Sequence, residues 1–299
     1  MIDLTVALAG LFVGFVVGLT GMGGGALMTP ILVLLFKVQP LAAVSSDIVA
    51  SMIMKPVGGG VHWRRGTVNT ELVKWLVLGS VPSAFLGVLV LKSSGQGAAL
   101  QSHVKLGLGI ALLVVAAGLI IRPLLTRGRK AGDSMVPLMV KKLPTVLIGV
   151  AGGLVVGLTS VGSGSLMIIL LLMLYPKLRL SELVGTDLVQ AIPLVASAAL
   201  GHAFFGDFQL ALTASILIGS VPGVFIGAQL SSRAPDRVIR PSLIVVLLGS
   251  SLKLLGSSNL VLGSVLAVFA GAYLLVLLSE QRGARAALAI DGKSPALKS

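Results

Sequence analysis

The sequence predicts an all-α protein that crosses a membrane many times and consists of two inverted repeats. Each repeat is expected to contain a glycine-broken helical hairpin and three further transmembrane helices, and one extra helix follows the second repeat. Three observations lead to this prediction: an apolar composition, two near-identical glycine-rich segments, and a one-sided distribution of Lys and Arg between the apolar stretches.

The composition leaves too little polar surface for a soluble protein. Hydrophobic residues make up 56% of the 299 residues and charged residues only 11%, whereas a soluble domain carries about 25% charged residues. The net charge of +13 does not indicate nucleic-acid binding, because the basic residues stand between apolar stretches rather than on one continuous face. The chain has no cysteine, which excludes disulfides and thiolate chemistry.

Apolar stretches follow one another along the chain. They cover residues 4–20, 26–36, 41–61, 70–91, 104–122, 143–159, 164–175, 181–204, 209–230, 238–256 and 260–279. The regular strand alternation of an outer-membrane barrel is absent from the sequence, and the first stretch lacks the basic region of a cleaved signal peptide. Four segments are therefore expected: a first repeat (1–122), a basic cytoplasmic linker (123–142), a second repeat (143–256), and a final transmembrane helix with a basic cytoplasmic tail (257–299).

Residues 14–28 and 153–167 are two copies of one segment. They read GFVVGLTGMGGGALM and GLVVGLTSVGSGSLM, and ten of the fifteen aligned positions are identical. An apolar run interrupted by glycine and small polar residues is typical of a helix broken inside a membrane. The second arms are about 16–18 Å long at 1.5 Å per residue, roughly half of the hydrocarbon core. We therefore expect the glycine tips inside the membrane, and whether each hairpin is re-entrant or makes two full passes stays open.

The positions of Lys and Arg decide between two topologies. If each glycine-broken stretch crosses once, the loops on the two sides carry ten and twelve basic residues. If each turns back as a hairpin, one side carries eighteen and the other only four: Lys37, Lys92, Lys105 and Lys253. The larger bias is that of a cytoplasmic face. The sequence thus predicts hairpins in a multi-pass protein of the bacterial inner (plasma) membrane, with a periplasmic N-terminus and a cytoplasmic C-terminus.

The repeat continues beyond the glycines at an offset of 140 residues. Asp47 aligns with Asp187, and the run Gly-Ser-Val-Pro occurs at both 79–82 and 219–222. A hairpin and three further helices give each unit an odd number of passes, so the second unit is predicted to be inverted. Inverted repeats place a binding site near the midplane, where the halves meet.

The two glycine tips are the predicted substrate-binding site. Their free backbone amides, helix dipoles and hydroxyls suit a small oxyanion. Glycine-mediated helix packing is the alternative, and the duplicated, hydroxyl-bearing pair favours the binding site. The predicted residues are Thr20, Gly21, Met22, Gly23, Gly24, Gly25, Thr159, Ser160, Gly162, Ser163, Gly164 and Ser165.

A second set of polar residues is predicted to line the path or to couple transport to an ion. Buried carboxylates in lipid often carry protons or bind cations, and an aspartate in the first turn of a helix is an equal alternative. For the histidines, an interfacial or helix-terminal position is favoured over a proton relay. Lys55, which aligns with Val195, is expected to balance Asp47, to attract anions or to snorkel. The set comprises Asp47, Asp187, Lys55, Gln190, His62 and His202.

The duplicated GLTGMGGG-type segments, the later Gly-Ser-x-Pro runs and the charged central loop resemble the sulfite exporter TauE/SafE family of membrane permeases. The resemblance spans nearly the whole chain and implies transport of sulfite, of organosulfonates such as sulfoacetate, or of related small anions. The second copy departs from the family pattern as GLTSVGSGS, which keeps the small residues and adds hydroxyls.

The expected function is outward secondary transport of a small sulfur-containing anion, by alternating access with the anion held between the two tips. An anion channel and an uptake permease for another small organic anion are the alternatives. No enzyme activity, cofactor or metal is expected, because the sequence shows no nucleophile–base or metal-ligand set. The expected partners are the anion, the lipid bilayer and a coupling proton or cation, without nucleic acid. The oligomeric state, the coupling ion and the exact substrate stay open.

Overall fold

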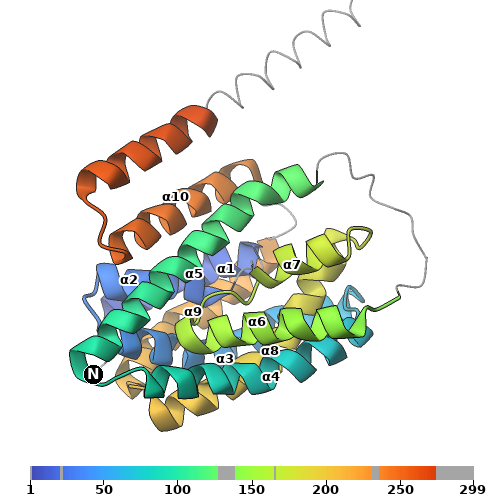
Figure 1. Ribbon diagram of the computed structural model, residues 1–299, viewed down its shortest axis with the longest axis horizontal. Helices are drawn as coiled ribbons and strands as arrows, with labels where there is room; N and C mark the ends of the chain where they lie inside the picture. Colours follow the sequence, from blue (N-terminus) through green and yellow to red (C-terminus); the bar gives the residue numbers. More distant parts are fainter. Residues whose placement is uncertain (1, 21–22, 127–138, 165, 231–235, 274–299) are drawn as a thin grey trace, which may run out of the picture. The chain divides into compact units, whose positions relative to one another are not determined.

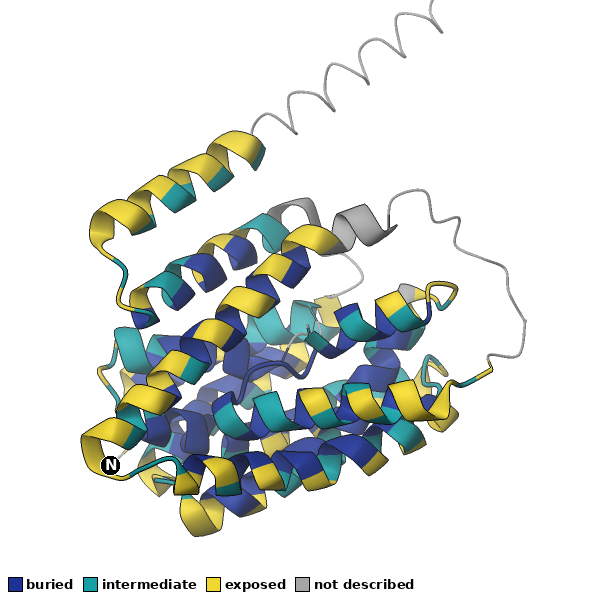
Figure 2. Cartoon of the chain, viewed as in Figure 1, coloured by how far each residue is buried: buried dark blue, intermediate teal, exposed yellow. Residues whose placement is uncertain are grey.

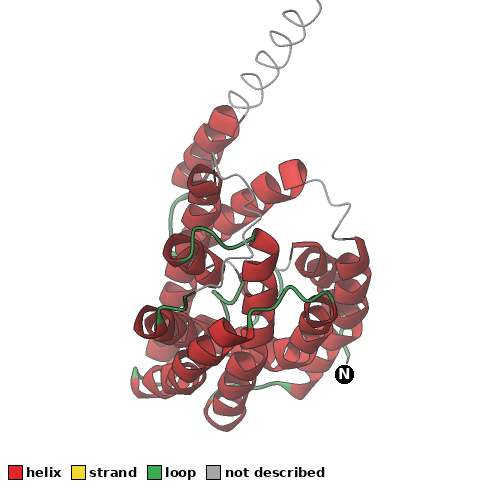
Figure 3. Cartoon of the chain, turned by 90° about the vertical axis from the view of Figure 1, so that its right-hand side faces the viewer, coloured by secondary structure: helices red, strands yellow, loops and turns green. Residues whose placement is uncertain are grey.

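The computed structural model describes residues 2–20, 23–126, 139–164, 166–230 and 236–273, and these residues form helices and loops without a strand (Figures 1 and 3). The first unit, residues 1–256, and the second, residues 257–299, are described separately. The elements of the first unit are α1 (Leu4–Thr20), η1 (Gly24–Ala26), α2 (Met28–Leu34), α3 (Pro40–Arg64), α4 (Thr70–Ser93), α5 (Gly97–Thr126), α6 (Lys142–Thr159), α7 (Leu166–Leu174), α8 (Leu180–Phe205), α9 (Leu210–Leu230) and α10 (Asp236–Leu254).

The predicted all-α, polytopic fold class is confirmed. Among the described residues, six helices are long and apolar enough to cross a membrane: α3, α4, α5, α6, α8 and α9. Shorter apolar helices span Leu4–Thr20 and, in the second unit, Asn259–Tyr273. Each predicted apolar stretch therefore corresponds to a helix, except that the final helix is described only as far as Tyr273.

The outward faces of the first unit's helices are apolar. Figure 2 shows buried residues on the inward faces and exposed residues on the outward ones. Phe12 is 65% exposed, Leu78 59% and Phe225 56%. An apolar surface of this extent is unfavourable in water and matches the hydrocarbon core of a bilayer.

The two repeats exchange their first helices. Helix α1 packs along α9, and α6 packs along α4. Because α6 is the sequence equivalent of α1, and α9 that of α4, the second interface repeats the first. Helix α3 packs against α8, its own equivalent. These contacts join the halves into one body, and the inversion of the second repeat stays a prediction.

Glycine allows the close approach at both exchanged interfaces. A Cβ atom at Gly223 of α9 would lie 2.4 Å from the carbonyl oxygen of Leu11, and one at Gly153 of α6 would lie 2.4 Å from that of Ser80. Small residues spaced four apart bring helix backbones together in this way inside membranes. The abundant glycine thus serves helix packing as well as the two breaks.

Two equivalent hydrogen bonds also tie each repeat to the other. The amide of Asn69 donates to Thr186 Oγ1 at 3.0 Å, and the amide of Gln209 donates to Ser46 Oγ at 3.3 Å. Each donor is 140 residues from its counterpart, and each acceptor directly precedes an aspartate, Asp187 or Asp47. The segments that carry the two aspartates are therefore held by the opposite halves.

The chain turns back at the second glycine break, as the Lys and Arg count predicts. Helix α6 ends at Thr159, and Ser160 adopts a left-handed conformation with φ 62°. Helix α7 then returns beside α6 (Figure 1), and the Tyr175 hydroxyl after it accepts a hydrogen bond from the Lys141 amide at 2.9 Å. The end of the second arm thus lies at the start of the first.

Replacing Tyr175 with phenylalanine is expected to lower stability. The change keeps the buried ring but leaves the Lys141 amide and the Thr145 hydroxyl without the oxygen that both contact. The Thr145 hydroxyl still donates to the Lys141 carbonyl oxygen, and Lys141 is exposed, so the loss is that of one hydrogen bond, about 0.5–1.5 kcal/mol. The midpoint of thermal unfolding in detergent should fall, while the matched change Thr5→Val, which removes an exposed hydroxyl, should leave it within a degree or so. An unchanged midpoint for Tyr175→Phe would contradict the hairpin contact.

Candidate functional site

The two glycine tips touch each other directly. The amide of Gly23 donates a hydrogen bond to the carbonyl oxygen of Ser163 at 3.1 Å. A Cβ atom at Gly25 would lie 2.0 Å from the carbonyl oxygen of Ser160. Only glycine fits at that distance, so the first tip is shaped to seat against the second.

Asp47 of α3 joins the two tips to the core. Its Oδ2 atom accepts hydrogen bonds from Thr29 Oγ1 of α2 at 3.0 Å and from Ser160 Oγ at 2.6 Å. Its Oδ1 atom is buried and has no hydrogen-bond partner. That oxygen points toward Gly24, since a Cβ atom there would lie 3.8 Å from it. One carboxylate oxygen is thus structural, and the other is left free.

Asp187 of α8 is held in a different way. Its Oδ1 atom accepts a hydrogen bond from Gln190 Nε2 at 2.9 Å, and Gln190 Oε1 accepts one from Ser80 Oγ at 3.2 Å. The peptide of Gly164 in the second tip also lies beside this carboxylate. Asp187 Oδ2 is buried without a hydrogen-bond partner. Both repeats therefore bring one unpartnered carboxylate oxygen into the protein interior.

Lys55 lies within electrostatic reach of both aspartates. Its side chain is 7% exposed, and its ammonium group interacts electrostatically with Asp187 and, more weakly, with Asp47. It makes no hydrogen bond or direct ion pair with a described residue. A buried ammonium that lacks a contacting partner is costly unless something else satisfies it.

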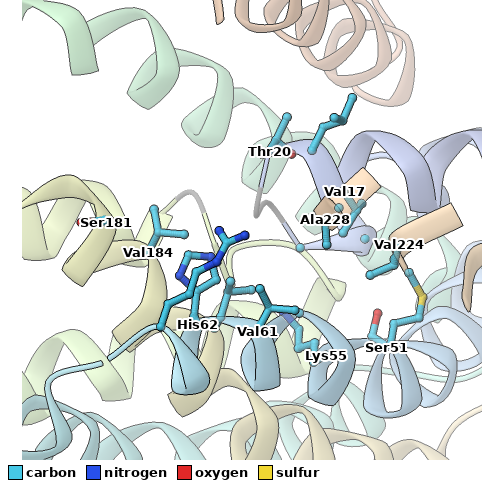
Figure 4. A pocket seen from close by; sticks show the side chains of 18 residues that line it. Val17, Thr20, Ser51, Lys55, Val61, His62, Ser181, Val184, Val224 and Ala228 are labelled. Carbon is cyan, nitrogen blue, oxygen red and sulfur yellow. The ribbon is translucent and has the colours of Figure 1, made fainter. Parts of the chain in front are cut away.

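A cavity of about 240 Å³ opens at Lys55 (Figure 4). Figure 4 shows Ser51, Lys55 and His62 along one side, with Thr20 and Val17 of α1 across from them. Gly23 and Gly24 of the first tip also line it, as do residues of α8 and α9. The cavity therefore lies between the two repeats, near the tips, in the region that the sequence predicted.

The polar lining of the cavity is basic. Lys55, His62 and Arg65 lie seven and three residues apart, which places them on one face of α3 over about 15 Å. Lys55 is buried, His62 is half-buried and bonds Thr67 Oγ1 through Nδ1 at 3.0 Å, and Arg65 is exposed. No acidic side chain belongs to the described lining. The charges of Arg65 at the mouth and Lys55 at the floor attract anions into the cavity.

The described residues of the second tip do not line the cavity. Its residues pack behind the first tip: Thr159 Oγ1 donates to the Val155 carbonyl oxygen at 2.7 Å, and Ser160 donates to Asp47. Of the residues predicted to bind substrate, the cavity contains Thr20, Gly23 and Gly24. Those outside its lining are Gly25, Thr159, Ser160, Gly162, Ser163 and Gly164, whereas Gly21, Met22 and Ser165 fall outside the described residues.

The two histidines have different environments. His62 lines the cavity, whereas His202 is fully buried in the last turn of α8. His202 Nε2 donates to the carbonyl oxygen of Gly157 at 2.8 Å, and Nδ1 bonds Ser45 Oγ at 2.9 Å. The helix-terminal position matches the expectation, but the side chain is enclosed by protein rather than interfacial.

The equivalents of the cavity-floor residues in the other half are buried. Met54, Lys55 and Gly58 correspond to Leu194, Val195 and Ala198, which are at most 2% exposed. Several residues equivalent to those on the other walls of the cavity are also buried. The closed set comprises Leu41, Val44, Ile48, Ala84, Val156, Leu194, Val195 and Ala198, all in one hydrophobic core. Among the described residues, a cavity thus opens at Lys55, whereas the equivalent Val195 is packed in the core.

The sequence is similar to known proteins over most of its length. The family profile described as sulfite exporter TauE/SafE matches residues 6–254. The chain belongs to this family. Its sequence is similar to the probable membrane transporter protein YjnA of Bacillus subtilis, with 42% identity over 255 residues, which are 85% of this chain and 100% of YjnA. YdhB of the same organism, also a probable membrane transporter, is 26% identical over 235 residues, or 77% of this chain and 91% of YdhB. No solved structure was matched.

Membership of the TauE/SafE family confirms the resemblance seen in the sequence. The protein is a multi-pass membrane protein with a role in transport, and it is not an enzyme. The family match also covers both glycine tips and the whole cavity, since these lie within residues 6–254.

Proposed function

We propose that this TauE/SafE protein transports a small sulfur-containing oxyanion, sulfite or an organosulfonate such as sulfoacetate, and that the anion binds at the cavity floor beside Lys55. The observation that supports this most strongly is the buried Lys55 ammonium, which borders the cavity and contacts no described partner. An oxyanion there gains a charge-assisted hydrogen bond and satisfies the ammonium.

The first glycine tip completes the proposed binding site. Gly23 and Gly24 line the cavity without side chains, so an anion approaches their backbone closely. The hydroxyls of Thr20 and Ser51 also border the cavity. In this proposal the second tip supports the first from behind instead of touching the anion, which changes the symmetric arrangement expected from the sequence.

The closed counterpart of the cavity favours alternating access over a channel. A channel needs an open path on both sides at once, whereas Leu194, Val195 and Ala198 are packed in the core at the equivalent place. In the proposed cycle the repeats exchange these arrangements, so that the site opens to one side and then to the other.

We infer that the open cavity faces the cytoplasm. Its exposed mouth carries Arg65 and Ser181, at the end of α3 and the start of α8. Under the hairpin topology this end of the bundle carries eighteen of the Lys and Arg residues, the bias of a cytoplasmic face. A cytoplasm-facing anion site agrees with the proposed export from the cell.

Ligand-induced stabilisation tests the substrate class. The purified protein is expected to unfold at a higher temperature with sulfite or a sulfonate, because a ligand that binds only the native state stabilises it by about 2.7 kcal/mol at a hundred times its Kd. The panel should include sulfite, sulfate, thiosulfate, sulfoacetate and methanesulfonate, with an uncharged sulfone as the control. Stabilisation by the sulfone to the same degree, or by none of the anions, would contradict the proposal.

A further inference from the structure

The charges of the three ionisable groups around the cavity floor do not cancel. Asp47, Asp187 and Lys55 carry a net charge of −1 when all are ionised, and the two carboxylates are at most 1% exposed. An anion that binds Lys55 would bring the net charge of this enclosed site to −2. Binding on those terms is strongly disfavoured in a medium of low dielectric constant.

The binding of one proton would compensate the negative charge that the anion brings to this site. We propose that Asp47 takes up a proton when the anion binds and gives it up when the anion leaves, so that proton and anion cross the membrane together in a ratio of one to one. The inference rests on the proposed anion site at Lys55 and deepens it by assigning the co-transported ion and the residue that carries it.

The geometry selects Asp47 rather than Asp187. Lys55 interacts electrostatically with both carboxylates and can balance only one of them, so one carboxylate is in surplus. Asp47 Oδ2 is occupied by two hydroxyl donors, whereas its Oδ1 is unpartnered and points at Gly24 in the cavity wall. A hydronium ion from the cavity supplies this proton: its O–H bond breaks, an O–H bond forms at Oδ1, and water remains.

The other ionisable groups near Asp47 are less suited than Asp47 to carry this proton. Helices α2 and α9, which pack on this part of the protein, contain no ionisable side chain. Helix α5 contributes His103 and Lys105, which are exposed, and α8 contributes Glu182, which accepts from the Arg179 amide at its own helix start, and His202, whose ring nitrogens bond Gly157 and Ser45. Arg65 is already charged, and His62 lies seven residues, about 10 Å, further along α3 than Lys55, so a proton there would act on the anion from a greater distance.

The sign of the coupling follows from linkage. A proton on Asp47 strengthens anion binding, and a bound anion strengthens proton binding by the same factor. Two ligands that bind together move together, so the proton and the anion travel in one direction. The proton gradient of a bacterial membrane would then drive the anion inward, and export would depend on a higher anion concentration in the cytoplasm.

Proteoliposomes with a trapped pH dye test this inference. Methanesulfonate is the probe, because a sulfonate stays ionised and carries no proton of its own. With the membrane potential clamped and no initial pH gradient, an inward methanesulfonate gradient is expected to acidify the lumen by one proton per anion taken up. Alkalinisation, or uptake without a pH change, would overturn the inference and leave the anion site standing.

Two variants assign the proton to its residue. In Asp47→Asn the amide oxygen still accepts from Thr29 and Ser160, so methanesulfonate exchange should persist within about threefold while proton movement falls at least tenfold. The affinity of the wild type for methanesulfonate should weaken as pH rises, by up to tenfold per pH unit, and that of Asp47→Asn should not. The control His62→Gln should keep the proton-to-anion ratio.

The outcomes separate the two proposals. If Asp47→Asn moves protons with the anion as the wild type does, the assignment to Asp47 is wrong. If this variant does not fold, the pH dependence of wild-type affinity still decides, since a pH-independent affinity overturns the coupling. If the wild type transports neither sulfite nor methanesulfonate, the proposed function itself fails.

Discussion

Lys55→Met is expected to lower the affinity for the transported anion by at least about thirtyfold and to reduce transport to background. Methionine fills a similar volume in the cavity floor but removes the cation that the anion contacts. Removing one partner of a buried, charge-assisted contact costs about 2–5 kcal/mol, and each 1.4 kcal/mol corresponds to about a tenfold change in affinity. The variant also leaves Asp47 and Asp187 without their cation, which repels an anion further.

Two matched variants show whether the effect belongs to the cavity floor. Lys105→Met removes an exposed lysine of α5 that does not line the cavity, so transport should be unchanged. Arg65→Gln removes the exposed cation at the cavity mouth. A peripheral charge changes association rate and salt dependence more than affinity, so Arg65→Gln should slow uptake a few-fold and mainly at low ionic strength.

Equilibrium exchange of labelled sulfite and methanesulfonate in proteoliposomes measures these effects. The thermal midpoint of each variant in detergent establishes that the protein is folded. Lys55→Arg keeps the positive charge and is expected to recover part of the lost affinity. If Lys55→Met is folded and exchanges anions as the wild type does, the anion does not bind at Lys55.

The fold could be predicted from the sequence because it rests on patterns that recur along the chain. The apolar stretches gave the positions of the helices, since a membrane requires long apolar segments whose backbone groups are satisfied internally. The one-sided Lys and Arg distribution gave the hairpins, and the contact between Tyr175 and Lys141 confirms the second of them. The exchange of α1 and α6 between the repeats could not be predicted, because it depends on glycines such as Gly153 and Gly223 that occur in many helices.

The interior positions of several polar residues could be predicted, whereas their roles in binding and coupling stay predictions. The sequence identified Asp47, Asp187, Lys55 and Gln190 as interior polar residues, because ionisable groups inside a membrane segment are rare and costly. It placed both glycine tips at the substrate, whereas among the described residues the first tip lines the cavity and the second does not. The two tips have nearly the same sequence, so their unequal positions depend on which of two equivalent arrangements the repeats adopt.

Two further residues escaped prediction for different reasons. Arg65 lies ten residues after Lys55 on the same face of α3, so helical spacing would have identified it as part of the cavity. Thr29 donates to Asp47 across a tertiary contact between α2 and α3. A single threonine that follows an apolar methionine carries no such signal in the sequence.

The contact between the tips predicts that substitutions of the neighbouring residues Gly25 and Gly24 have different effects on stability. Gly25→Ala is expected to destabilise the protein, because the new Cβ atom would lie 2.0 Å from the backbone oxygen of Ser160. The tips must then separate, which strains the hydrogen bond from Gly23 to Ser163 and the one from Ser160 to Asp47. Overpacking a well-packed interior costs about 1–3 kcal/mol, and the thermal midpoint should fall accordingly.

Gly24→Ala is the matched control, one residue away in the same 3-10 turn. The nearest atoms to a Cβ there are Met54 Cε and Ser51 Oγ at 3.6 Å and Asp47 Oδ1 at 3.8 Å, which are ordinary contacts. This variant should fold with a midpoint close to that of the wild type, yet bind the anion more weakly because its methyl group enters the cavity. Equal midpoints for the two variants would mean that the tips do not meet as described. A stable Gly24→Ala with unaltered anion affinity would exclude the first tip from the binding site and leave Lys55 as its main determinant.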